Sequence, residues 1–287
     1  MANDKGDCLG QSLFLCQEAY TEITIFFGGI MKKSGMGGVL LLALTLITGL
    51  SILYWRDVGE RLMTANASVN GTEFPIYSVE CGEPRIALAF QVKGSNENLR
   101  KIEKVLEKNQ VKSTFFVDGG WAKAYPEEVR NIIEGGHDLG SSGKEYREMT
   151  ELSQRACRNQ IRQLHESIRE NFGYEMELFS IPYGRYDNSV IQSVYACGYY
   201  PVCWSVDTMD WKNYGEQDIV SQVTEHENLK NGAIIRWNTN GKYTVAALEH
   251  ILEILREEGY EVVPVSRLIY RENFYMDSSG RQFGKES

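Results

Sequence analysis

Ile86-Ala-Leu-Ala-Phe90 is a short, uninterrupted apolar run, typical of a strand that is buried on both faces. A helix follows, with apolar residues on one face from Leu99 to Leu106, and Val111 to Val117 predicts the next strand. The alternation continues through a strand predicted at Tyr200 to Val206 and ends with one at Glu261 to Val265. This pattern predicts an α/β fold whose parallel sheet is covered by helices. Functional groups are then expected at the carboxyl ends of the strands.

Capping residues mark several helix ends. Pro126 is suited to a first helical turn, and Ser153 precedes a long amphipathic helix that should end at Gly173. Asp187 and Thr244 are predicted as the caps of two later helices, because short oxygen-bearing side chains accept hydrogen bonds from the first free N–H groups.

The segment 34–55 contains no charged residue before Arg56 and is apolar enough to cross a bilayer as one helix. Lys32 and Lys33 precede it, which predicts a cytoplasmic N-terminus and an extracytoplasmic main domain. A cleaved signal peptide is the alternative, although Ala65-Asn-Ala67, the small-residue cleavage pattern, lies well beyond the apolar run. We expect a single-pass protein of the cell membrane.

The chain of 287 residues is therefore divided into five parts. Met31-Lys-Lys resembles a translation start, so residues before it are either a cytoplasmic tail or an upstream mis-start. The predicted parts are a cytoplasmic tail at 1–33, a membrane anchor at 34–55, a polar linker at 56–73, the main domain at 74–270 and a C-terminal tail at 271–287.

The composition is that of a folded protein with an ordinary core, at 43% hydrophobic and 24% charged residues. A formal net charge of -9 gives no reason to expect a nucleic-acid partner. The six cysteines include no C-x-x-C pair, and Cys157 and Cys197 are expected to be small buried hydrophobes.

Five segments occur in an order that resembles the NodB-homology polysaccharide deacetylases, carbohydrate esterase family four. The likeness is strongest to the sporulation-type, peptidoglycan-directed subgroup and covers roughly residues 74 to 282. It implies a distorted barrel of about seven parallel strands. The segments are Ile86 to Phe90, Gly136-His-Asp-Leu-Gly140, Pro182-Tyr-Gly184, Trp204-Ser-Val-Asp-Thr-Met-Asp-Trp211 and Gly232-Ala-Ile-Ile235.

Active members of this family hydrolyse an N-acetyl group with a divalent metal such as zinc, held by an aspartate and two histidines. An aspartate base, a histidine acid and an arginine that steadies the base complete the site. The amide bond requires these groups, because a metal polarises the carbonyl, a base activates water and an acid protonates the leaving amine.

The resemblance places residues without this chemistry at the base and metal positions. Gln91 stands for the base and Val92 for the metal-binding aspartate. Ser142 and Tyr146 replace the two histidine ligands, and neither is a usual ligand of a divalent metal. Lys144 is expected to add a positive charge nearby. We expect no metal cofactor.

The remaining positions are changed in part. Ser180 replaces the arginine and Asn238 the catalytic histidine, whereas Asp210 and Trp211 match the family motif. The resemblance assigns the backbone N–H of Tyr183 to the oxyanion and Trp211 to the substrate groove.

The four histidines do not supply the missing groups. His137 matches a framework histidine of the family, and His165, His226 and His250 lie in helical or polar stretches. Asp138, Glu145 and Asp210 remain as carboxylates for an unconventional site.

The leading hypothesis is an inactive, membrane-anchored deacetylase-like protein that binds a cell-wall glycan or an extracytoplasmic protein. Sugar rings would stack on aromatic residues of the groove. The alternative is that these aromatic residues only pack in the core or at its rim. These residues are Trp121, Tyr183, Trp211, Trp237 and Tyr243. The alternatives are an active hydrolase of C–N bonds and a regulatory partner of an active deacetylase, in a spore-forming bacterial context.

Overall fold

The computed structural model describes residues 67–285 together with residues 45, 47–49 and 51. The chain divides into two compact units, Met1–Gly59 and Glu60–Ser287. The described residues of the first unit are helical. Among the described residues no helix has the length and apolar character needed to cross a membrane, and nearly all of the predicted anchor 34–55 lies outside them.

Eight parallel strands form the main sheet of the second unit, in the order β8-β7-β6-β5-β4-β10-β9, with β11 beside β4. β4 is buried along nearly its whole length, as its apolar sequence predicts. The strands are β4 Arg85–Gln91, β5 Thr114–Val117, β6 Asp138–Ser141, β7 Leu178–Ser180, β8 Tyr200–Val202, β9 Val206–Asp207, β10 Ile234–Asn238 and β11 Glu261–Val263.

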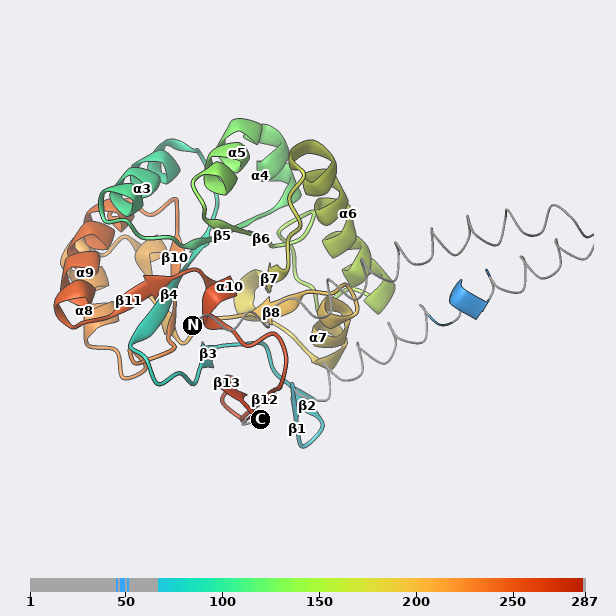
Figure 1. Ribbon diagram of the computed structural model, residues 1–287. Coiled ribbons are helices and arrows are strands. Elements are labelled where there is room, and N and C mark those ends of the chain that lie inside the picture. The colour runs from blue at the N-terminus through green and yellow to red at the C-terminus, as the bar shows by residue number, and fades with distance from the viewer. Residues whose placement is uncertain (1–44, 46, 50, 52–66, 286–287) are drawn as a thin grey trace, which may run out of the picture. The chain divides into compact units, whose positions relative to one another are not determined.

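Helices pack around the outside of this sheet (Figure 1). Three predicted helix ends are confirmed: Ser153 accepts a hydrogen bond from Ala156 N at 3.3 Å, Asp187 caps α7, and Gly173 ends α6 in a left-handed conformation. The helices are α3 Glu97–Lys108, α4 Gly119–Ala124, α5 Pro126–Glu134, α6 Gln154–Phe172, α7 Asn188–Tyr195, α8 Glu216–Thr224, α9 Thr244–Glu257 and α10 Val265–Leu268, with the short 3₁₀ turns η2 Pro182–Gly184 and η3 Asp210–Lys212.

The single strand predicted at Tyr200 to Val206 is wrong, because the chain crosses there from one edge of the sheet to the other. β8 pairs with β7, and β9 pairs with β10. Between them, Cys203 N donates to Ile76 O, which lies beside β8, and Ser205 N donates to Ile234 O of β10. The two edge strands are only three residues apart in sequence. The sheet is therefore curled into the distorted barrel that the resemblance implies.

Both ends of the second unit form small sheets. The predicted linker contains the hairpin β1 Ser68–Val69 and β2 Thr72–Glu73, which are antiparallel. The predicted C-terminal tail contains β12 Phe274–Met276 and β13 Arg281–Gly284, and β13 pairs in parallel with β3 Ser78–Val79. Phe274 is fully buried in this segment, so the tail contributes to the core.

Candidate functional site

The residues at the family's catalytic positions converge at the carboxyl ends of four strands. Gln91 ends β4 and lies opposite Asn238, the last residue of β10, in the parallel register. Ser180 ends β7, and Ser142 follows the end of β6. All four are buried, with Gln91 only 2% exposed. Parallel strands thus bring together side chains that are far apart in sequence.

Neutral hydrogen bonds link the residues that replace the base, the arginine and one metal ligand. Gln91 Nε2 donates to Ser180 Oγ at 2.7 Å, and Ser142 Oγ donates to Gln91 Oε1 at 3.5 Å. An amide cannot accept a proton from water near neutral pH. At the position of the catalytic base, Gln91 therefore makes a structural hydrogen bond that links the ends of β4 and β7.

Asp210 is fully buried, and each of its oxygens accepts hydrogen bonds. Asn238 donates its backbone N–H at 2.9 Å and its Nδ2 at 2.8 Å. The Thr244 hydroxyl donates to Oδ2 at 2.8 Å. Burial raises the pKa of Asp210 above its usual range, and the bonds from Asn238 and Thr244 oppose that rise. Thr244 was expected to cap α9, and this expectation is wrong because its hydroxyl is used by Asp210.

Tyr183 has a left-handed backbone, with φ of 60° and ψ of 0°, which is costly for a residue with a side chain. Its N–H, assigned by the resemblance to an oxyanion, donates instead to Tyr146 Oη at 3.1 Å. The two rings also meet edge to face, with centroids 4.9 Å apart. Tyr146, which stands in the place of a metal ligand, thus accepts a hydrogen bond from the Tyr183 amide.

The donor set at this site does not fit a divalent metal. Val92 is apolar and buried, and the hydroxyls of Ser142 and Tyr146 are poor ligands when they are protonated. Across residues 67–285, no group of three or more histidine, cysteine or acidic side chains is placed to hold an ion.

The four histidine side chains make structural contacts and do not contribute to the strand-end site. His137 is buried, accepts a hydrogen bond from Ser113 N at 3.1 Å and contacts the Phe115 ring edge to face. Burial lowers its pKa to about 4, so the ring is neutral at pH 7. The other three make contacts outside the strand-end site: His165 with Tyr199 and Glu175, His226 with Asn228 N, and His250 with Glu216.

The aromatic groove is smaller than the sequence predicts. Tyr183 and Trp211 are 56% and 52% exposed and can present ring faces to a ligand. Trp237 is fully buried and stacks on Phe90, so its assignment to the groove is wrong. Side chains alternate along a strand, and Trp237 must face away from the site when Asn238 faces toward it. Trp121 is also buried.

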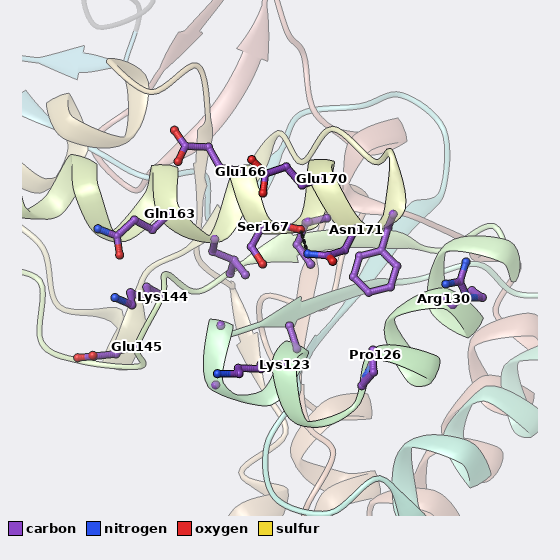
Figure 2. Close-up of a pocket in the computed structure, with 16 residues that line it drawn as sticks. Lys123, Pro126, Arg130, Lys144, Glu145, Gln163, Glu166, Ser167, Glu170 and Asn171 are labelled. Atoms are coloured by element: carbon purple, nitrogen blue, oxygen red, sulfur yellow. Dashed lines mark hydrogen bonds between the residues drawn. The ribbon is translucent and has the colours of Figure 1, made fainter.

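Lys93 supplies a positive side chain at the site, although the family motifs do not single it out. Its Nζ lies 3.6 Å from the centre of the Tyr146 ring. Lys144, the residue expected there, lines a different pocket between α4, α5 and α6 (Figure 2). That pocket mixes Lys123 and Arg130 with acidic side chains and contains none of the residues at the catalytic positions. The signal for Lys93 was its place directly after Gln91 and Val92.

Comparisons with known proteins identify related sequences and structures. The family model described as polysaccharide deacetylase matches residues 79–202. Residues 79–202 therefore belong to a polysaccharide deacetylase domain. It is 28% identical over 195 residues to the uncharacterized protein YlxY of Bacillus subtilis, covering 68% of this chain and 60% of that protein. It is 30% identical over 184 residues to the peptidoglycan-N-acetylglucosamine deacetylase PgdA of Listeria monocytogenes, covering 64% of this chain and 38% of that enzyme.

Among solved structures, this deacetylase homologue is similar to the family-four pseudoenzyme BA3943. A BA3943 mutant with restored enzymatic activity superposes with a TM-score of 0.64 at 26% identity, covering 68% of this chain and 70% of that one. The wild-type protein, from Bacillus anthracis, has a TM-score of 0.65 at 24% identity. The family therefore contains a member described as a pseudoenzyme on the same fold.

Proposed function

We propose that this polysaccharide deacetylase homologue is catalytically inactive and acts by binding a cell-wall glycan or an extracytoplasmic protein. The observation that carries the proposal is the neutral contact of Gln91, Ser142 and Ser180 at the place of the base and metal. General acid and base groups each contribute about 10²- to 10⁴-fold to such a reaction. A site that lacks both, and has no ligand set for a metal, has little to accelerate hydrolysis.

An active hydrolase built on other carboxylates is less well supported. Asp138 starts β6, at the amino end of the sheet, and accepts hydrogen bonds from Thr114 Oγ1 and from Ser266. Glu145 pairs with Arg147 and lines the outer pocket. Asp210 is buried and saturated with donors. None of these carboxylates has a second catalytic group beside it.

The test is acetate release by the purified full-length protein with N-acetylglucosamine oligomers and with peptidoglycan, in the presence of zinc or cobalt. We expect no metal-dependent release and less than stoichiometric divalent metal by elemental analysis. Metal-dependent turnover by the unmodified protein contradicts the proposal.

A matched variant restores the family's residues at five positions. It combines Gln91→Asp, Val92→Asp, Ser142→His, Tyr146→His and Asn238→His. We expect this variant to bind one divalent ion per chain while the parent does not, because the strand ends already hold the five positions together. Metal binding by both proteins counts against the proposed inactivity.

The proposed location is the cell membrane, with the N-terminus inside and the deacetylase fold outside. The uncharged run at 34–55 behind Lys32 and Lys33 supports it. Protease added to intact cells should then remove the fold and leave a membrane-bound fragment. Recovery of the whole protein in the soluble fraction contradicts this location.

A further inference from the structure

A half-buried positive charge, Lys93, lies at the strand-end site. Lys93 is held in place by its backbone, whose N–H donates to Thr239 Oγ1 at 3.0 Å and whose carbonyl lies 3.2 Å from the same hydroxyl. Its Nζ lies over the Tyr146 ring and 6.0 Å from the centre of the Tyr183 ring. Within residues 67–285 this ammonium forms no ion pair with a carboxylate.

The carboxylates near the site are already neutralised or buried. Asp207 pairs with Arg236, and Glu148 pairs with Arg185. Asp210 lies beneath the surface with its oxygens occupied by donors. These carboxylates are therefore occupied by partners within the protein and are not free to bind a cation. The Lys93 ammonium group remains available to bind an anion.

Tyr146 adds a hydrogen-bond donor beside that ammonium. Its oxygen accepts the Tyr183 N–H, so its own proton is left to donate, and no acceptor within the described part of the chain receives it. An ammonium and a phenol O–H together form a site suited to an anion.

Exposed rings and further lysines lie on loops at the same end of the barrel. The Lys212 Nζ is 5.5 Å from the centre of the Trp211 ring, and Lys242 lies over Tyr243 at 4.9 Å. The Lys242 N–H donates to Asn213 Oδ1, which ties these two loops together. Three lysines, Lys93, Lys212 and Lys242, thus lie over aromatic rings beyond the carboxyl ends of the strands.

We propose that this strand-end surface binds a glycan through an anionic substituent held by Lys93 and the Tyr146 hydroxyl, with sugar rings against Tyr183 and Trp211. The inference rests on the proposed glycan-binding function and adds the charge of the ligand. Tyr146, at a position that holds a cation in active relatives, here helps Lys93 to hold a sugar-linked anion, either a carboxylate or a phosphodiester.

Calorimetric titration of the full-length protein tests this with four probes. The first is a disaccharide of N-acetylglucosamine and N-acetylmuramic acid with its lactyl carboxylate free, and the second has that carboxylate converted to an amide. The third is neutral chitotetraose, and the fourth is a glycosylated glycerol phosphate oligomer. We expect one of the two anionic probes to bind about 10-fold more tightly than the neutral ones, and which one identifies the anion.

Variants separate the anion site from glycan binding in general. Lys93→Gln should abolish the preference for the anionic probe, and Lys93→Arg should retain most of it. Lys104→Gln removes the same charge from the exposed face of α3 and should change nothing. Equal binding of charged and neutral sugars overturns the anion site but leaves glycan binding intact. Failure of all four probes to bind overturns glycan binding itself and this inference with it.

Discussion

Asp210 is a buried carboxylate beside an amide, where the family places a histidine. Asn238 satisfies it through two N–H groups and Thr244 through a hydroxyl. A buried charge without such partners would be strongly destabilising. At the scale of single residues, the site is therefore a hydrogen-bonded structural unit.

Removing the Thr244 hydroxyl tests this description. Thr244→Val should lower the free energy of unfolding by about 1.5 to 3 kcal/mol, because a buried carboxylate loses a donor. Thr244→Ser keeps the hydroxyl and should cost about 1 kcal/mol, from the lost methyl group. Urea denaturation near pH 7 measures both. Equal losses would mean that the hydroxyl contributes nothing.

Glu103, on α3, provides a pH-dependent prediction. Burial raises its pKa to about 7, and the nearby Glu128 adds to the rise. The folded state then holds the proton more tightly than the unfolded chain, whose glutamate has a pKa near 4.5. This stabilisation is complete below pH 4.5 and is lost as the pH rises through about 7.

Glu103→Gln should therefore make the protein more stable than the parent at pH 8, by about 1 to 2 kcal/mol after allowing for solvent screening. Below pH 4.5 the two proteins should have similar stability. Chemical denaturation at a series of pH values measures the difference, and a constant offset across the series contradicts the assignment.

At the scale of elements, one glycine connects β3 to the strand that carries Asn238. Gly232 has a φ of +80°, and a Cβ added there would lie 1.6 Å from the Val79 carbonyl oxygen. Its N–H donates to Arg85 O, and its carbonyl accepts from Val79 N. Backbone on both sides prevents the clash from relaxing.

Gly232→Ala should cost about 3 kcal/mol or more in unfolding free energy, or prevent folding. Gly259→Ala is the matched control, since its φ is +83° and its Cβ would meet no atom within 4 Å. The control should cost only the backbone strain, about 1 to 2 kcal/mol. Similar costs for the two variants would exclude a steric role for the Val79 carbonyl.

The elements also show what the sequence could predict. The apolar strands and capped helices were identified because short-range periodicity and N-cap chemistry are local. The division of Tyr200 to Val206 into two strands was missed, because that segment is apolar throughout and its division depends on pairing with distant strands. Thr244 was misassigned for a similar reason, since a threonine before a helix is typical of a cap. The partner that uses its hydroxyl is 34 residues away.

At the scale of the whole molecule, the C-terminal hairpin completes the core. Phe274 is fully buried, whereas its neighbour Tyr275 is 46% exposed and stacks on Phe283. Phe274→Ala should lower the unfolding free energy by about 3 to 5 kcal/mol. Tyr275→Ala removes a ring of similar size from the same strand and should cost about 1 kcal/mol. Thermal denaturation of both variants measures the contrast, and a small effect of Phe274→Ala would make this segment an appendage.

The catalytic positions were located from sequence because family motifs fix their order along the chain. Their convergence followed from parallel topology, in which the strand ends meet at one edge. The burial of Trp237 and the placement of Lys93 depend on side-chain direction and on loop packing, which motif order does not encode.

The contact between Tyr146 and the Tyr183 amide has a consequence for inhibitors. A hydroxamate designed against active relatives gains affinity from a metal and from donors around it. In this protein such a compound would have to compete with the Tyr146 hydroxyl for the Tyr183 N–H. The hydroxyl is part of the same chain, so its effective concentration at the amide does not fall on dilution. Metal-directed compounds should therefore discriminate between this protein and catalytically competent deacetylases in the same cell.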